Sequence, residues 1–197
     1  MWTRELLGTD VYHLVAAFVV YSILGWLVES IYMSFCNRKL TNRGFGKGPF
    51  CPIYGFGAVI GYLVLSPMRG NYIKIYLVGA FLATTFEFIV GKGMIKFLGD
   101  LWWDYNEKPF NYKGIICLES SIAWGFYAIG VVHFVHGAVY RLIDSFDVRI
   151  GIRLIQIILL GVMIDYIIQL TKVLDIDLKE KKNSIKEKYQ SFIARWY

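Results

Sequence analysis

Charged residues are scarce in this chain of 197 residues, since only 18% of them are Asp, Glu, Lys or Arg; soluble domains average about 25%. Hydrophobic residues make up 56%, and the charges are clustered, which leaves long stretches nearly free of them. This composition excludes a disordered chain and an ordinary soluble α/β enzyme. Cysteine is also rare, and its 3 residues make no disulfide framework. The sequence therefore predicts an all-α integral membrane protein.

Five segments are long and apolar enough to approach the roughly 20 helical residues that cross a hydrocarbon core. They are 11–35, 51–68, 72–98, 115–142 and 150–170. The second begins with Cys51-Pro52, and proline costs little in a first helical turn because its missing N–H would be unpaired there. Gly57-x-x-x-Gly61 in the same segment predicts a face that another helix approaches closely. We expect a transmembrane bundle of five helices over 1–174, with two motif-rich loops at 36–50 and 99–114.

Basic residues are distributed unequally between the two sides of this bundle. Fifteen of the 21 Lys and Arg residues flank one set of helix ends, which leaves six for the other. The richer side should be cytoplasmic, so we expect a multi-pass protein of the cell membrane with its N-terminus outside and its C-terminus inside. The net charge of +6 is then explained by membrane flanks, and it does not indicate binding to nucleic acid.

The last segment, 175–197, is rich in lysine, but its apolar residues recur at helical spacing. This pattern predicts an amphipathic cytoplasmic helix. Such a helix either lies on the anionic inner leaflet or docks a cytoplasmic partner.

Four carboxylates lie inside the apolar spans, where each costs about 2.5–3.5 kcal/mol at mid-bilayer. They are Glu29, Glu87, Glu119 and Asp165. Counted from the nearest basic residues, all four fall in the cytoplasmic half of the membrane, and we expect them to face protein or water. Three aromatic residues accompany them and suit a cation through cation–π attraction. These are Trp26, Tyr54 and Trp124.

We predict that these seven residues line a polar cavity open to the cytoplasm, where they bind a substrate or a proton. The alternative is that each acid pairs with a neighbouring Lys, Arg or hydroxyl and only fixes the register of its helix.

The two cytoplasmic loops are rich in glycine, and we expect them to fold back against the bundle. Five of their residues should hold the loops in place or bind an anionic group. These are Asn42, Arg43, Lys47, Asp104 and Asn111. Each loop follows a helix with a glutamate near its end, and each contains an Asn, then Gly-x-x-Cys, then a new helix. One hypothesis is a two-helix unit that occurs twice in parallel orientation, with a fifth helix added.

Cysteine and histidine offer further candidate ligands. Cys51 and Cys117 both stand at predicted helix starts, and we interpret them as small buried residues rather than as a nucleophile or a metal pair. His133 and His136 are three residues apart, but no partner ligand lies on another span. We interpret them as interfacial histidines, so we expect no metal and no cofactor.

Several strings of the sequence resemble a bacterial family of membrane proteins. They are YSILGWLVES (21–30), NRGF (42–45), GPFCPIYG (48–55), WDY (103–105), PFN (109–111), GIICL (114–118) and WG (124–125). These strings resemble the "putative ABC-transporter type IV" permeases, the CmpB-like proteins, over roughly 12–170. The resemblance implies a permease subunit that works with a separate ATPase, and it assigns no substrate and no catalytic residue. Since five helices make a small permease, we expect a dimer or a larger assembly.

Three functions fit these observations. The first is a transport-type protein with an acidic cavity, in which the ATPase is a separate chain because no G-x-x-x-x-G-K-[ST] sequence is present. The second is a membrane-embedded enzyme on a lipid or lipid-linked substrate, with Glu29 or Glu119 as base and with Arg43 and Lys47 holding a head-group phosphate. The third is a non-catalytic assembly or sensor subunit, which the charged tail suggests.

Overall fold

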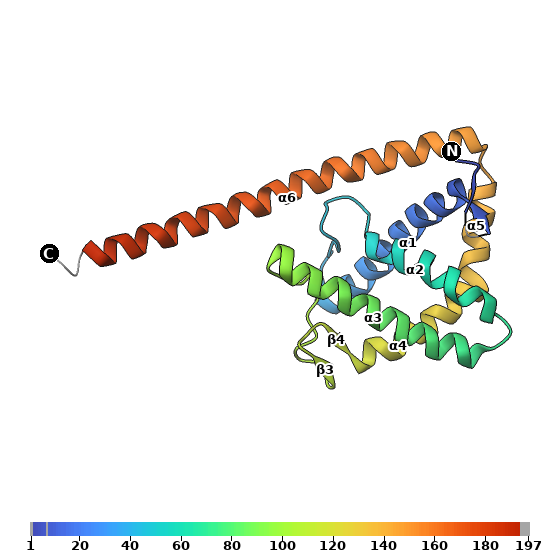
Figure 1. Cartoon of the computed structure of the whole chain (residues 1–197), viewed down its shortest axis with the longest axis horizontal. Coiled ribbons are helices and arrows are strands. Elements are labelled where there is room, and N and C mark those ends of the chain that lie inside the picture. Colours follow the sequence, from blue (N-terminus) through green and yellow to red (C-terminus); the bar gives the residue numbers. More distant parts are fainter. Residues whose placement is uncertain (1, 7, 194–197) are drawn as a thin grey trace.

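The computed structural model describes residues 2–6 and 8–193, with side chains for 2–5 and 8–173, and helices dominate this part of the chain (Figure 1). In this part, four helical stretches are long and apolar enough to span a membrane. They are α1 (Val11–Asn37), α3 (Tyr72–Leu98), the stretch Leu118–Asp144, and Val148–Val173 within α6 (Val148–Ile193). The protein is therefore an all-α membrane protein, as the composition predicts.

The elements differ from the predicted spans in three places. The segment 51–68 forms α2 (Pro52–Leu65) and the 3₁₀ turn η1 (Ser66–Met68), which is shorter than the other four helical stretches. The segment 115–142 begins in a hairpin and becomes helical only at α4 (Leu118–Gly130), which continues through the π-helical turn η2 (Val131–Val135) into α5 (His136–Asp144). The helix α6 runs past residue 170 to Ile193. The amphipathic character predicted for 175–197 lies outside the described side chains.

Local signals at the helix ends explain where the long helices begin and stop. Asp10 and Asn71 accept hydrogen bonds from backbone N–H groups in the first turns of α1 and α3. Arg38 and Gly99, both in the left-handed conformation, end the same two helices. Cys117 caps α4 through Ser120.

Two short antiparallel hairpins complete the fold. Strand β1 (Glu5–Leu6) pairs with β2 (Thr9–Asp10) just before α1. Strand β3 (Asn111–Tyr112) pairs with β4 (Ile116–Cys117) in the second loop. The turn between β3 and β4 needs positive φ at Lys113 and Gly114, a conformation that favours glycine.

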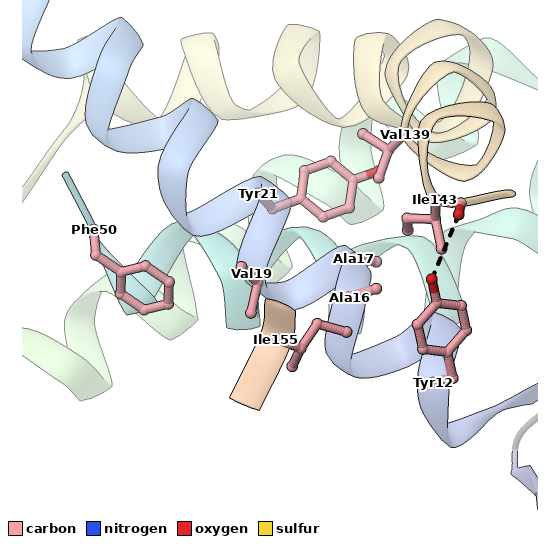
Figure 2. Close-up of a cluster of buried hydrophobic side chains, with 9 residues drawn as sticks. All are labelled: Tyr12, Ala16, Ala17, Val19, Tyr21, Phe50, Val139, Ile143 and Ile155. Atoms are coloured by element: carbon pink, nitrogen blue, oxygen red, sulfur yellow. Dashed lines mark hydrogen bonds between the residues drawn. The ribbon is translucent and has the colours of Figure 1, made fainter. Parts of the chain in front are cut away.

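The main cluster of buried side chains joins three helices at one end of the bundle. It consists of Tyr12, Ala16, Ala17, Val19, Tyr21, Phe50, Val139, Ile143 and Ile155 (Figure 2). Most of these belong to α1, and α5, α6 and the first loop supply the rest. The hydroxyl of Tyr12 donates to the carbonyl of Ile143 at 3.5 Å. At the same end, His13 lies between Asp10 (Nδ1 to Oδ2, 2.8 Å) and Asp144 (Nε2 to Oδ1, 2.9 Å), which ties the start of α1 to the end of α5.

Close helix approach depends on glycines other than the predicted pair. A Cβ on Gly25 would overlap the ring of Tyr54, and a Cβ on Gly55 would overlap Ser22 and Phe18, so α1 and α2 meet at these two glycines. By contrast, a Cβ on Gly61 would meet no atom of the described chain within 4 Å. The prediction that Gly57-x-x-x-Gly61 forms the close-approach face is therefore wrong for the packing within this chain.

Alanine at Gly55 and at Gly61 compares these two environments within one helix. We expect G55A to destabilise the protein by about 1–3 kcal/mol, the usual cost of overpacking a close contact. G61A should be neutral or slightly stabilising, because alanine favours a helix over glycine by about 1 kcal/mol. Thermal unfolding of the full-length protein in mild detergent measures both changes, and equal effects of the two substitutions would contradict this packing.

Candidate functional site

The first predicted acid, Glu29, is held by one residue from the first loop and one from α2. Its Oε1 accepts a hydrogen bond from Arg43 Nε at 2.9 Å, which makes an ion pair, and its Oε2 accepts one from the Tyr54 hydroxyl at 2.8 Å. The side chains of Glu29 and Arg43 are 24% and 21% exposed. The charge of Glu29 is therefore balanced inside the protein.

The first loop carries Arg43 to this position because it folds back onto α1. The Oδ1 of Asn42 accepts a bond from Trp26 Nε1 at 2.6 Å, and its Nδ2 donates to the carbonyl of Lys47 at 2.9 Å. The backbone N–H of Arg43 donates to Ser30 Oγ at 3.2 Å. Three of the predicted loop residues thus take part in one network that fixes the loop.

The second acid, Glu87 on α3, is 5% exposed and sits among neutral hydrogen-bond donors. Its Oε1 accepts from the Tyr105 hydroxyl at 3.0 Å, and its Oε2 accepts from Trp124 Nε1 at 3.1 Å and Ser120 Oγ at 3.4 Å. Among the described side chains, none with a basic group lies within 4.0 Å of it. Within the described side chains, Glu87 therefore differs from Glu29 in that all its hydrogen bonds come from neutral groups and none from a counter-ion.

Two aromatic rings connect these acids. Tyr54, which donates to Glu29, and Trp124, which donates to Glu87, lie with their ring centroids 6.4 Å apart. We call Glu29, Tyr54, Trp124 and Glu87 the acid–aromatic row. The row crosses from α1 through α2 and α4 to α3, and it contains four of the seven residues that the sequence predicts for a binding site.

The other two acids have separate partners. Glu119, in the first turn of α4, has a side chain that is 61% exposed and pairs with Lys108 Nζ at 2.9 Å. The hydrogen bond and charge of Glu119 raise the pKa of Lys108. Asp165 accepts from the backbone N–H of Gly48 at 3.0 Å and from Gln169 Nε2 at 3.2 Å.

The second loop is held by its own polar residues and is linked to the first. Asn111 donates to the carbonyls of Asn106 and Lys108 and accepts from the N–H of Gly114. Asp104 accepts from the N–H of Asn106 at 2.8 Å. A further bond, from Arg43 Nη2 to the carbonyl of Trp102 at 2.8 Å, joins the two loops.

A groove of about 610 Å³ lies beside the end of α1. It is lined by Trp26, Leu27, Ser30, Ile31, Ser34, Phe35, Lys39, Leu40, Thr41 and Asn42. Two predicted residues, Trp26 and Asn42, belong to this lining, whereas none of the four carboxylates does. This groove is mainly apolar and is distinct from the acidic cavity that the sequence predicts.

Sequence reasoning missed two donors to Glu87 and assigned a different role to a third residue. Tyr105 is not among the predicted site residues, but its hydroxyl contacts Glu87. Ser120 had no predicted role, although it stands three residues after Cys117, as Tyr54 stands three after Cys51. Arg43 is predicted to hold a loop or an anion, and the structure also makes it the counter-ion of Glu29.

Removing the Tyr105 hydroxyl tests the network around Glu87. Y105F leaves a buried carboxylate oxygen without its donor, and we expect it to lower the free energy of unfolding by about 1–3 kcal/mol. Y112F is the matched control, because Tyr112 lies in the same loop region and is 53% exposed. Unfolding in detergent measures both variants. A cost for Y105F no larger than that for Y112F would contradict the described network.

The model of the family described as "Putative ABC-transporter type IV" matches residues 16–170, which include both loops and all four acids. No curated protein and no solved structure shows a significant match to the chain.

Proposed function

The chain belongs to the family described as "Putative ABC-transporter type IV", and on this premise we propose that it is the membrane-spanning subunit of a transport system. In this proposal the acid–aromatic row binds a proton or a cationic substrate. The long apolar helices already establish a membrane protein. The proposal adds the transport role and assigns the binding of positive charge to Glu29 and Glu87.

The observation that carries the proposal is the lack of a basic partner for Glu87 among the described residues. An ionised carboxylate buried at membrane depth is costly unless a proton or a cation neutralises it. Glu29 already has a counter-ion in Arg43. The two acids of the row therefore share one basic partner, Arg43, which leaves one acid that a further positive charge could neutralise.

The aromatic members of the row support a cation as well as a proton. Trp124 and Tyr54 donate to the acids through their N–H and O–H groups, while their ring faces are electron-rich. A cation at the row would be attracted by the carboxylates and by the ring faces. A proton would need only one carboxylate oxygen.

The duplicated unit predicted from the sequence also supports equivalent roles for the two acids. Each glutamate accepts one bond from the loop that follows its helix, from Arg43 or Tyr105. Each also accepts one from the third residue after the cysteine that starts the next helix, Tyr54 or Ser120. We propose that α1–α2 and α3–α4 are two copies of one unit, with α6 added.

The topology that we propose follows the basic residues. With 15 of the 21 Lys and Arg on one side, that side faces the cytoplasm of a cell membrane, the N-terminus lies outside, and the C-terminus lies inside. The row then lies in the cytoplasmic half of the bilayer. The two loops and the end of α6 face a separate ATPase subunit, and two copies of the chain form the transport pathway.

The enzyme hypothesis is less well supported by the geometry. It requires the Arg43 guanidinium for a head-group phosphate, but that group already binds Glu29 and the carbonyl of Trp102. Its second candidate base, Glu119, is exposed and paired with Lys108. The contacts therefore favour transport.

Ligand-induced stabilisation of the full-length protein tests the proposal. Its unfolding midpoint is measured in mild detergent from pH 8 to pH 5, and separately with tetramethylammonium at constant ionic strength. A ligand at about 100 times its Kd stabilises the folded state by about 2.7 kcal/mol. We expect wild type to respond to at least one probe. The double variant E29Q/E87Q should lose that response, since it has no carboxylate in the row.

E119Q is the matched control, because it removes an acid of α4 that is not a member of the row. It should respond as wild type does. An unchanged response in E29Q/E87Q, or its loss in E119Q, would contradict the assignment of positive-charge binding to the row.

A further inference from the structure

Helix α6 holds the first loop through two adjacent residues, Asp165 and Tyr166. Asp165 Oδ2 accepts a hydrogen bond from the N–H of Gly48 at 3.0 Å. The hydroxyl of Tyr166 donates to the carbonyl of Phe50 at 3.2 Å, and its ring forms a T-shaped pair with Phe45, with the centroids 5.3 Å apart. These contacts tie the loop to α6 at three points.

The fit between Asp165 and the loop depends on a glycine. A Cβ on Gly46 would overlap Asp165 Oδ2, whereas a Cβ on Gly48 would lie at an ordinary contact distance of 3.6 Å from the same atom. The loop backbone thus approaches the carboxylate at Gly46 more closely than any other residue type allows. The Asp165 carboxylate therefore fixes the conformation of the loop at Gly46 and Gly48.

From this point the contacts continue to Glu29. Phe45 stacks on Trp102 with the ring centroids 5.1 Å apart and the planes at 16°. Arg43 donates from Nη2 to the carbonyl of the same Trp102 and from Nε to Glu29. The part of the loop that α6 holds therefore lies next to the guanidinium that neutralises the acid.

We propose that Asp165 and Tyr166 are positioning residues that keep Arg43 on Glu29, so that α6 controls whether this acid is neutralised. The role of Glu29 in transport rests on the proposed function, but the contacts from α6 to Glu29 do not. Asp165 is then a regulator of the row and not one of its ligands, which explains why its partners differ from those of Glu29 and Glu87.

The length of α6 explains how a movement outside the bundle could reach Arg43. The helix is continuous from Val148 to Ile193, and its stretch Val148–Val173 is apolar and long enough to span a membrane (Figure 1). Figure 1 shows its C-terminal half leaving the bundle. A displacement of this projecting end moves Asp165, then the loop, and with it Arg43.

The test measures how readily Glu29 reacts with a hydrophobic carbodiimide in the full-length protein in detergent. This reagent modifies protonated carboxyl groups, so an acid paired with Arg43 reacts slowly. The modified residue is identified by mass spectrometry, with Glu119 in the same digest as the internal reference. R43Q defines the labelling of Glu29 without its counter-ion, and we expect it to be several-fold higher than in wild type.

D165A should raise the labelling of Glu29 several-fold, toward the R43Q value, because the loop loses the hydrogen bond from Gly48 to the carboxylate. D165N should stay near wild type, since an amide oxygen still accepts the bond from Gly48. G46A should raise the labelling and G48A should not. The labelling in the double variant G46A/D165A should stay close to that in D165A, because removing the carboxylate removes the overlap with it and leaves only a tight contact of 3.0 Å with the Tyr166 ring.

Size-exclusion profiles and unfolding midpoints identify any variant that has lost its fold, and D165N and G48A, which we expect to fold as wild type does, keep the comparison valid. Wild-type labelling in D165A, beside raised labelling in R43Q, would overturn the control by α6. Unchanged labelling in R43Q would overturn the last step of the proposal, in which Arg43 neutralises Glu29. Neither result depends on cation or proton binding by the row, so failure here is distinct from failure of the proposed function.

Discussion

Carboxylates inside a membrane-spanning bundle must be neutralised or hydrogen-bonded, and this requirement organises the two long loops of the protein. Arg43 of the first loop pairs with Glu29, and Tyr105 of the second loop donates a hydrogen bond to Glu87. Both loops consequently fold back against the helices instead of extending into water. Their own polar residues and the bond from Arg43 to Trp102 then join them to each other.

Close helix contact allows these bonds to form. The glycines Gly25 and Gly55 bring α1 against α2, which sets the Tyr54 hydroxyl on Glu29. Where α3 meets α4, a Cβ on Gly125 would lie 2.5 Å from the Tyr76 ring, and the neighbouring Trp124 donates a hydrogen bond to Glu87. At both helix contacts, a glycine is adjacent in sequence to the aromatic residue that donates a hydrogen bond to the acid.

Much of the fold could be predicted from the sequence, because hydropathy and helix caps are local signals. The segment 72–98 matches the bounds of α3, and the start of α1 at Val11 is also confirmed. The length of α2 is the main difference, since Pro52 and the turn at Ser66–Met68 confine it to 14 residues. The β3–β4 hairpin was not predicted, because two-residue strands leave no periodic pattern.

The candidate site could be predicted only in part. Burial cost identifies the acids, but the depth of a residue along its helix does not determine which way its side chain faces. Counting along the helices predicts one depth for all four acids, yet Glu119 lies at the surface with Lys108 and Asp165 holds a loop. The pairing of Arg43 with Glu29 depends on how the loop folds, which no local pattern encodes.

The proposed function is tested most directly by the uptake of a proton at Glu87, the acid of the row that has no basic partner among the described side chains. Infrared difference spectroscopy of the protein before and after acidification measures this directly, because protonation converts a carboxylate band into a carboxylic acid band. We expect a protonation band that is present in wild type and in E119Q and is absent in E87Q. An identical band in wild type and E87Q would contradict it.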